Sequence, residues 1–389
     1  MKSHYDVIVI GGGFGGVYAT RKLLRAGLEV LLISEHNHFT FTPLLHEVAT
    51  GNLSARDVTF EYGSFFKNRH FCFLRDTVTD LDPKRKYVRC GKRKINFNYV
   101  IVATGSTTNY FGMKGTEHVH VLKTLIDALE LKKRMVELAQ GPERNVDVAV
   151  IGGGPTGMEL VIEMQQFLTE MEQRECDLKF SVTLIQSGPA VLGMYPERVQ
   201  RYGERVLKKH DIKLLTNTKA REVTSASVHT TKGRIQANLT VLAAGVAPRT
   251  AFAQDSCNER NHLNVNAHLQ LEGYRSVFAI GDIIVQNQER IPKLAQTATR
   301  QGLVAADNII RLKKKKVLRG YSPNLKGTMV SLGWGRGAAV IGPLIITGFI
   351  GWWMWRTVYL FKTPGLRNKL EVAFSWTIDL FTGKNLVEH

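Results

Sequence analysis

Two runs of apolar residues in this chain share one pattern: each is followed by a Gly-rich turn and then by a segment with helical spacing. Residues 5–10 read YDVIVI and precede GGGFGG and VYATRKLLRAG, whereas residues 146–151 read VDVAVI and precede GGGPTG and MELVIEMQQFL. A continuous apolar run predicts a strand buried on both faces, and apolar positions three and four apart predict an amphipathic helix. The chain therefore predicts two βα units of an α/β fold with parallel sheets.

Both turns carry the spacing G-x-G-x-x-G, at Gly11, Gly13 and Gly16 and again at Gly152, Gly154 and Gly157. In such a turn the first glycine allows the tight bend, the second lets the backbone approach a pyrophosphate, and the third lets helix and strand pack closely. The helix that follows points its partial positive charge at the phosphates. We therefore predict two Rossmann-like dinucleotide-binding domains; a Gly-rich turn without a ligand is the alternative.

The residue at the end of the second strand of each unit predicts how the ribose is held. The strand EVLLIS ends at Glu35, twenty-four residues after Gly11, and a carboxylate there accepts hydrogen bonds from ribose hydroxyls. The strand FSVTLI ends at Gln186, thirty-four residues after Gly152, where a longer helix and loop account for the extra length. Gln186 lacks the negative charge that repels a 2′-phosphate, so we expect NADPH to be tolerated alongside NADH.

Three later strands end in turns of small residues: YVIVATGS at 99–106, LTVLAAGVAP at 239–248 and VFAIGDII at 277–284. Each returns the chain to a sheet beside a cofactor in this interpretation. Asp282, at the end of the last strand, is placed to accept a hydrogen bond from a ribityl hydroxyl of a flavin. A simple turn residue is the structural alternative for Asp282.

Composition adds charge and redox context. The 389 residues carry a net charge of +18, which favours an anionic partner such as nucleic acid or a membrane surface, although a basic protein without such a partner is the alternative. The length allows two or three domains. The four cysteines, at 72, 90, 176 and 257, form no C-x-x-C. Their spacing argues against a disulfide framework, a zinc site and a dithiol redox mechanism, and it fits a reducing compartment.

The order VIVIGGGFGG…E, VIVATG, VIGGGPTGMEL, AAG and AIGD resembles the flavoprotein reductases with two dinucleotide-binding domains. FTPLLHEVATG at 41–51 and AQTATRQG at 295–302 are similar to type II NADH dehydrogenases, the single-subunit NAD(P)H:quinone oxidoreductases. The resemblance implies a discontinuous FAD-binding domain at 1–110 and 240–325. It also implies an inserted NAD(P)H-binding domain at 111–239 and a C-terminal membrane-binding segment at 326–389.

The same resemblance implies roles for individual residues. Those that hold FAD are Gly11, Gly13, Gly16, Glu35, Thr104, Gly105 and Asp282. Those on the nicotinamide side are Gly152, Gly154, Gly157, Gly245 and, at the ribose, Gln186. Glu159 matches a carboxylate near nicotinamide and flavin, with an ordinary acid in the first turn of a helix as the alternative.

The quinone stretch of that family, A-Q-x-A-x-Q, matches at Ala295, Gln296 and Ala298 and departs at Arg300. Arg300 is either a cationic donor to a quinone oxygen or a solvated helix charge. Gln301 cannot simply replace it, because one residue rotates a helix position by about 100°. The catalytic candidates are therefore Glu159, Gln296 and Arg300, and the chemistry requires no metal.

The segment 337–355 contains no charged residue and is long enough for a transmembrane helix. Gly342 and Pro343 interrupt it, so we predict a strand GAAVIG and then an aromatic-rich helix from about Ile346 to Phe361, followed by the amphipathic stretch EVAFSWTIDLF. Tryptophans beside cations predict two amphipathic helices that lie on an anionic membrane surface rather than span it. Packing of these aromatics in a core or a dimer interface is the alternative.

These features together predict a non-proton-pumping NAD(P)H:quinone oxidoreductase of a respiratory chain. It would use FAD and NADH, with NADPH also possible, on the cytoplasmic face of the inner membrane, and the family resemblance implies that it is a homodimer. Its partners would be a membrane quinone and anionic lipid, and no nucleic acid. The alternatives are a soluble FAD-dependent NAD(P)H reductase of a protein carrier such as ferredoxin, and a non-catalytic flavoprotein that binds NAD(P)H.

Overall fold

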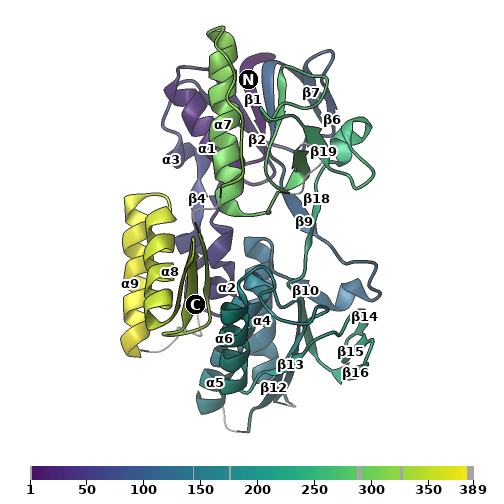
Figure 1. Ribbon diagram of the computed structural model, residues 1–389, viewed down its shortest axis with the longest axis vertical. Helices are drawn as coiled ribbons and strands as arrows, with labels where there is room; N and C mark the ends of the chain where they lie inside the picture. Colours follow the sequence, from purple (N-terminus) through teal and green to yellow (C-terminus); the bar gives the residue numbers. More distant parts are fainter. Residues whose placement is uncertain (1, 143, 175–176, 287–290, 325–326, 383–389) are drawn as a thin grey trace. The chain divides into compact units, whose positions relative to one another are not determined.

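The computed structural model describes residues 2–142, 144–174, 177–286, 291–324 and 327–382 (Figure 1). The chain forms two compact units, each built from three separate segments. Unit 1 comprises Met1–Thr40, Thr59–Thr107 and Val246–Leu325. Unit 2 comprises Phe41–Val58, Thr108–Gly245 and Lys326–His389.

Unit 1 is organised around a sheet that has seven strands within the described residues, with β1 (His4–Ile10) between β2 (Val30–Ser34) and β8 (Arg93–Val102). The pairs β1–β2 and β1–β8 are parallel, as are β2–β5 (Phe71–Arg75) and β8–β20 (Val277–Ala279). The antiparallel strands β7 (Tyr87–Cys90) and β6 (Asp80–Asp82) extend one edge. The predicted buried strand is confirmed, because Val7, Ile8 and Val9 have no exposed surface.

Two helices of unit 1 lie side by side, α1 (Phe14–Arg25) and α7 (Ala295–Lys313) (Figure 1). Their approach requires glycine at the crossing, because a Cβ atom on Gly302 would lie 2.3 Å from the carbonyl oxygen of Gly15. The close packing leaves no room for a larger side chain, so a one-carbon addition at Gly302 would push the helices apart.

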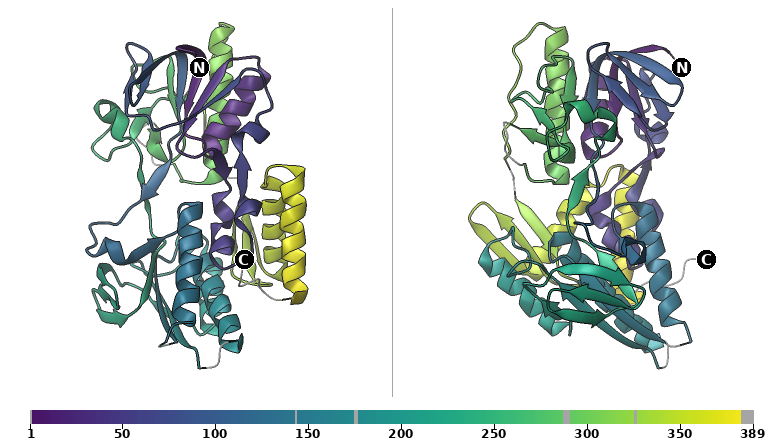
Figure 2. Two further views of the ribbon diagram at one scale, coloured as in Figure 1. Left: turned by 180° about the vertical axis from the view of Figure 1, so that it is seen from behind. Right: turned by 90° about the vertical axis from the view of Figure 1, so that its right-hand side faces the viewer.

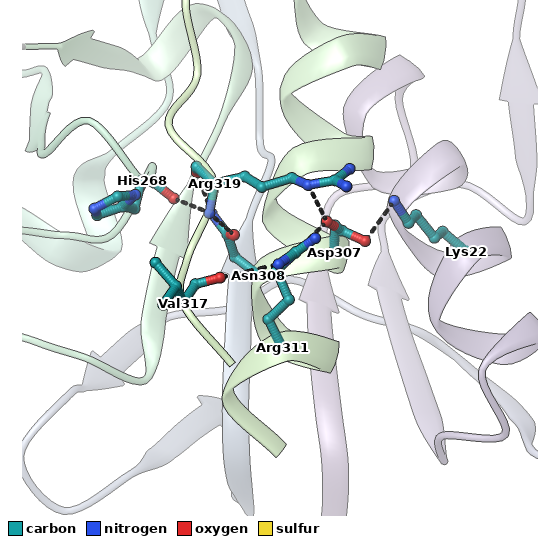
Figure 3. A network of polar contacts seen from close by, with 7 residues as sticks. All are labelled: Lys22, His268, Asp307, Asn308, Arg311, Val317 and Arg319. Carbon is teal, nitrogen blue, oxygen red and sulfur yellow. Dashed lines mark hydrogen bonds and ion pairs between the residues drawn. The ribbon is translucent and has the colours of Figure 1, made fainter. Parts of the chain in front are cut away.

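A polar network fixes α7 within unit 1 (Figure 3). The Asp307 carboxylate lies 3.1 Å from Nζ of Lys22 on α1 and 3.5 Å from Nε of Arg319. The next residue, Asn308, is fully buried, and its amide nitrogen donates to the carbonyl oxygens of His268 and Arg319. A buried amide with several partners holds α7 in one position along the segments that flank it.

The smaller elements of unit 1 connect these parts. The antiparallel pair β3 (His38–Thr40) and β4 (Thr59–Glu61) is followed by α3 (Tyr62–Phe65). The remaining strands are β9 (Ser106–Thr108), whose last residue belongs to unit 2, paired with β18 (Val246–Pro248), and β19 (Leu263–Val265) paired with β21 (Ile284–Gln286). The single-turn segment η5 (Gly281–Ile283) follows β20.

Unit 2 contains a second parallel sheet, in the order β10-β17-β11-β12-β13. Its strands are β10 (Val119–Val121), β11 (Asn145–Ile151), β12 (Lys179–Ile185), β13 (Lys213–Leu215) and β17 (Leu239–Leu242). The helices α4 (Leu125–Ala139), α5 (Pro155–Arg174) and α6 (Glu197–Lys209) pack on this sheet. An antiparallel sheet comprises β14 (Ala220–Thr224), β15 (Ser227–Thr230) and β16 (Gly233–Gln236).

The C-terminal segment of unit 2 begins with an antiparallel sheet of β22 (Thr328–Ser331), β23 (Gly337–Ile341) and β24 (Leu344–Gly348). The helices α8 (Phe349–Lys362) and α9 (Leu366–Thr382) follow and lie side by side, in yellow in Figure 2. The segment 41–58 contributes η1 (Thr42–Leu44), α2 (Leu45–Ala49) and η2 (Ala55–Val58), and α2 contacts α4 and α5.

The predicted strand GAAVIG is confirmed as β23, but the predicted start of the helix at about Ile346 is wrong. Residues Leu344–Gly348 form β24 instead, paired with β23 through the turn at Gly342, whose φ is +56°. The β-branched Ile345, Ile346 and Thr347 favour a strand once a partner strand is adjacent. Among the described residues, none of the helices combines the length and the hydropathy needed to cross a membrane.

The compact units differ from the domain limits predicted from the sequence. Residues 41–58 group with unit 2, and so does the tail from residue 326, which is not a unit of its own. Strand β17, which we assigned from residue 240 onward to the first domain, pairs with β10 and β11 in the sheet of unit 2. Apolar strands of similar composition can join either sheet, so the local sequence does not show which unit a strand belongs to.

Candidate functional site

The first Gly-rich turn joins β1 to α1 and leaves its middle open. Gly11 has φ of +101°, and a Cβ atom there would lie 2.3 Å from the Ala103 carbonyl oxygen. A Cβ atom on Gly16 would lie 1.9 Å from the carbonyl oxygen of Gly11. At Gly13 nothing lies within 4 Å of a Cβ position. The turn therefore needs glycine at both ends, because a side chain would be strained at Gly11 and would clash at Gly16. At its centre it leaves an open approach to the helix N-terminus.

Glu35 lies directly after β2, at the predicted ribose position, and is already engaged. Its Oε1 atom accepts hydrogen bonds from Nη2 of Arg249 at 2.7 Å and from Oγ1 of Thr77 at 3.4 Å. The hydrogen bond from Arg249 lowers the pKa of the Glu35 carboxyl group despite its partial burial. Sequence reasoning missed Arg249, because it follows β18, more than two hundred residues from Glu35.

The remaining predicted residues of unit 1 gather at the ends of β8 and β20. Oγ of Ser106 donates to Oδ2 of Asp282 at 2.5 Å, and Oγ1 of Thr104 donates to the Arg249 carbonyl oxygen at 2.6 Å. Gly105 has φ of +66° with open space around a Cβ position. The Asp282 carboxylate and the open turn at Gly13 thus belong to one unit. The carboxylate suits a hydroxyl and the turn suits a diphosphate, so together they fit a dinucleotide.

The second Gly-rich turn repeats the geometry of the first. Gly152 has φ of +116°, and a Cβ atom on Gly157 would lie 1.8 Å from the Gly152 carbonyl oxygen. Nothing lies within 4 Å of a Cβ position on Gly154. At Gly245, φ is +68° and the Phe111 ring lies 2.3 Å from a Cβ position. Unit 2 therefore presents a second open turn at the N-terminus of α5.

Gln186 lies after β12, at the predicted ribose position, and has a structural role that the sequence did not reveal. Its Oε1 atom accepts from the backbone N–H of Gly153 at 2.9 Å, and its Nε2 atom donates to the Ala190 carbonyl oxygen at 3.2 Å. The amide therefore ties the Gly-rich turn to the loop after β12. An open surface pocket of about 590 Å³ on α6 is lined by Arg198, Arg201, Glu204, Arg205 and Lys208.

Glu159, in the first turns of α5, is buried, with an exposed fraction of 8%. The backbone N–H of Ser331 donates to its Oε1 atom at 3.1 Å, and Nδ1 of His46 lies 3.9 Å from its Oε2 atom. Burial, with smaller effects from the nearby charges of Glu47 and Glu163, raises the pKa of the Glu159 carboxyl group to about 8. The group therefore holds a proton at neutral pH, which an exposed helix acid would not.

The sequence did not single out the other ionisable groups around Glu159. Glu47 accepts from Nε1 of Trp376 at 2.6 Å, and Glu163 accepts from Nδ2 of Asn52 at 2.5 Å. The sequence held a partial indication of these groups, because His46 and Glu47 are ionisable residues in the otherwise apolar stretch 41–51. The contacts of segment 41–58 with α5 and α9 join residues that are far apart in the sequence, so the sequence does not predict them.

Gln296 and Arg300 lie on α7 of unit 1, whereas Glu159 belongs to unit 2. Arg300 is half-buried, and its guanidinium donates to the Asn324 carbonyl oxygen. Gln301 is fully buried, and its Oε1 atom accepts from the backbone N–H of Gly281 at 2.7 Å. Gln301 therefore supports the turn that carries Asp282, in agreement with the expectation that it does not replace position 300.

Cys72, Cys90 and Cys257 are free thiols, and Cys176 lies outside the described residues. Within the parts of the chain that the structure describes, no group of three or more His, Cys, Asp or Glu side chains is arranged to hold a metal ion.

Comparison with known proteins agrees with this geometry. The chain is 29% identical to a type II NADH:quinone oxidoreductase of Mycobacterium tuberculosis, over 96% of this chain and 88% of that protein. It is 24% identical to a probable NADH dehydrogenase of Dictyostelium discoideum, over 98% and 90%. The structure of NDH2 from Plasmodium falciparum in complex with NADH has a TM-score of 0.90 at 20% identity, over 99% and 100% of the two chains.

The fold is also similar to that of a sulfide:quinone oxidoreductase from Aquifex aeolicus, with a TM-score of 0.77 and 20% identity over 98% of this chain and 96% of that chain. A family model described as pyridine nucleotide-disulphide oxidoreductase matches residues 5–302, which include both Gly-rich turns. The chain therefore belongs to the pyridine nucleotide-disulphide oxidoreductase family.

Proposed function

We propose that the protein is a type II NADH dehydrogenase, an FAD-dependent NAD(P)H:quinone oxidoreductase. The observation that carries the proposal is the pair of glycine turns, each of which requires glycine at its first position and is open at Gly13 or Gly154. Two such turns in one chain suit two dinucleotides, one that stays bound and one that exchanges. The relatives named type II NADH:quinone oxidoreductase, similar over nearly the whole chain, support the quinone as acceptor.

The FAD-binding residues in this proposal are those of unit 1: Gly11, Gly13, Gly16, Glu35, Thr104, Gly105 and Asp282. When bound, FAD accepts two electrons as a hydride and passes two electrons to a quinone. The N-terminus of α1 would face the diphosphate, and the Glu35 oxygen that Arg249 does not hold would be available to a ribose hydroxyl.

The nicotinamide nucleotide binds unit 2 in this proposal, at Gly152, Gly154, Gly157, Gly245 and Gln186. Because Gln186 has no charge, the 2′-phosphate of NADPH meets no repulsion from that position. NADH and NADPH are therefore both substrates. Glu159 lies near the N-terminal end of α5, the helix that follows this Gly-rich turn. As a neutral acid it donates a proton or a hydrogen bond beside the nicotinamide site.

In this proposal Gln296 and Arg300 donate hydrogen bonds to the quinone. The Gln296 amide is a neutral donor suited to a carbonyl oxygen, and Arg300 keeps further N–H donors besides the one given to the Asn324 carbonyl. A hydrogen bond to a quinone oxygen favours its reduction because negative charge develops on that oxygen.

The C-terminal helices provide the membrane contact in this proposal. Apolar side chains of the tail with more than half of their surface exposed are Trp334, Leu344, Phe349, Ile350, Trp353, Phe361, Leu370 and Phe374. The opposite faces of α8 and α9 are packed, with Trp355 and Trp376 buried. Together with the charge of +18, this amphipathic division suits peripheral binding to anionic lipid on the cytoplasmic membrane face. A homodimer is part of the proposal only because the family resemblance implies it.

Two measurements test this function. Anaerobic stopped-flow mixing with NADH or NADPH should bleach the flavin absorbance, and a quinone added afterwards should restore it. Failure of both nucleotides to bleach the flavin contradicts the proposal. The protein should sediment with phosphatidylglycerol vesicles but not with neutral vesicles at high salt. This result distinguishes the enzyme from a soluble reductase of a protein carrier.

A further inference from the structure

Helix α6 of unit 2 carries a concentrated positive charge on one face. Its thirteen residues include two acids and five cations, which are Arg198, Arg201, Arg205, Lys208 and Lys209. At about 100° per residue, the cations fall within an arc of roughly 100° around the helix axis, and both acids lie just beyond one edge of that arc. All five cations are exposed, whereas the buried residues of the helix lie on its other side. Helix α6 therefore presents a basic face to solvent.

The cations of the basic face repel one another. Arg201 and Arg205 are four residues apart and Arg205 and Lys208 are three apart, spacings at which like charges oppose helix formation. The ion pair between Arg201 and Glu197, at 3.2 Å, joins side chains that are 66% and 72% exposed, so water and salt weaken it. An anionic partner along this face would relieve the repulsion, and the open pocket of about 590 Å³ leaves room for anionic groups.

Contacts on three sides join α6 to the C-terminal sheet of the same unit. Before the helix, Oη of Tyr195 donates to the Met329 carbonyl oxygen on β22 at 3.0 Å. In its middle, the hydroxyl of Tyr202 interacts with the backbone of Gly348, at the end of β24. Directly after the helix, Nη1 of Arg336 lies 3.0 Å from Nε2 of His210. The basic face therefore has a fixed position beside the strands that lead into α8.

The sheet beside α6 also exposes apolar side chains. Trp334, Leu344 and Phe349 have exposed fractions of 59%, 55% and 59%. Phe349 directly follows the residue that meets Tyr202, and the Arg205 guanidinium lies 5.8 Å from the centroid of the same Tyr202 ring. Cations and exposed apolar side chains thus adjoin, as they do in proteins that lie on an anionic bilayer. A partner that offers charge alone, such as nucleic acid, would leave these apolar side chains in water.

Resting on the membrane contact in the function proposed above, we propose that α6 docks on the phosphate headgroups of anionic phospholipids in a bilayer. Its arginines suit this partner, because a guanidinium offers parallel N–H donors to phosphate oxygens. The apolar side chains of Trp334, Leu344 and Phe349 enter the boundary between headgroups and acyl chains beside it. The membrane contact therefore extends beyond α8 and α9 to a helix that packs on the nucleotide-binding sheet, and it holds that sheet at the bilayer surface.

The decisive experiment measures how flavin-loaded protein partitions between buffer and phosphatidylglycerol vesicles at about 0.1 M salt. The α6 variant, with Arg201→Gln, Arg205→Gln and Lys208→Gln combined, removes three charges from the basic face. Each cation near an anionic surface raises the partition constant roughly fivefold, so the constant of this variant should fall by about 100-fold. The difference from wild type should shrink at about 0.5 M salt, where charges are screened over a shorter distance.

The matched control removes three exposed cations at the antiparallel sheet β14–β16, which lies away from α8 and α9 in Figure 1. It combines Lys219→Gln, Arg221→Gln and Arg234→Gln. The control has the same net charge as the α6 variant, and its partition constant should stay within about threefold of the wild-type value because these cations lie away from the proposed contact. Both variants should retain bleaching by NADH, since neither changes a Gly-rich turn.

Equal partition of the α6 variant and the control variant overturns the proposal. So does an α6 variant that loses binding to a DNA duplex while it keeps wild-type binding to vesicles, because the basic face would then serve nucleic acid. A wild-type protein that NADH does not bleach contradicts the proposed function instead, whatever its partition, so the two failures are distinguishable.

If the α6 variant does not fold, chemical labelling of the wild-type protein decides the matter. Phosphatidylglycerol vesicles should slow the acetylation of Lys208 by a water-soluble reagent severalfold, because the bilayer covers the basic face. Lys219, which is also exposed, should react at the same rate with and without vesicles. Equal slowing at both lysines, or slowing at neither, contradicts the proposal.

Discussion

The buried carboxyl group of Glu159 has a measurable consequence for stability. Its pKa is about 8 in the folded chain, compared with 4.5 for an ordinary glutamate, chiefly because burial disfavours the charged form. A raised pKa in the folded state stabilises the fold below the unfolded pKa, and this contribution is lost as the pH rises through the folded pKa. Glu159 therefore weakens the fold progressively between about pH 4.5 and pH 8.

Glu159→Gln replaces the acid with a neutral amide that still accepts from the Ser331 backbone N–H. Each pKa unit corresponds to about 1.4 kcal/mol, so the variant should gain on the order of 2 kcal/mol over wild type at pH 6 and about 4 kcal/mol at pH 8. Near pH 4.5 the two proteins should be almost equally stable, apart from the cost of the new amide group.

Urea unfolding of both proteins across this pH range, followed by circular dichroism, measures the difference in the free energy of unfolding. Glu172→Gln is the matched control, because Glu172 is an exposed acid on the same helix. Its difference from wild type should not change with pH. If the difference for Glu159→Gln is also constant with pH, Glu159 is ionised in the fold at neutral pH and the reasoning is wrong.

Four further predictions address the other parts of the molecule. Gly157→Ala should abolish bleaching by NADH and lower the melting temperature, because its Cβ atom would lie 1.8 Å from the Gly152 carbonyl oxygen. Gln186→Glu should lower the NADPH/NADH ratio of kcat/KM by about tenfold, because it adds a charge that opposes the 2′-phosphate and loses the donor to Ala190; an unchanged ratio excludes this position as the selector. Trp376→Phe should destabilise the protein by about 2 kcal/mol in denaturant titrations, since buried Glu47 loses its indole donor, and a change within 0.5 kcal/mol contradicts that role. Ser at both Ile350 and Trp353, which are exposed on α8, should reduce sedimentation with anionic vesicles while bleaching by NADH is retained; undiminished sedimentation excludes α8 as the contact.

Local sequence predicted the parts of the candidate site that depend on short-range geometry. Both Gly-rich turns lie where they were expected, because a strand, a tight turn and a helix are specified within about twenty residues. Glu35 and Gln186 follow their strands as predicted, since each position is set by the length of one βα unit. The prediction failed in the tail, where residues 344–348 pair with β23 instead of starting a helix.

The sequence by itself determined the two dinucleotide-binding motifs, the apolar strands and the amphipathic character of the tail, because each is written in neighbouring residues. Tertiary structure decided which partners the candidate site residues have. Arg249 on Glu35, and His46, Glu47 and Trp376 around Glu159, come from segments far apart in the chain. The raised pKa of Glu159 follows from that assembly, because burial and neighbouring charge exist only after distant segments have packed together.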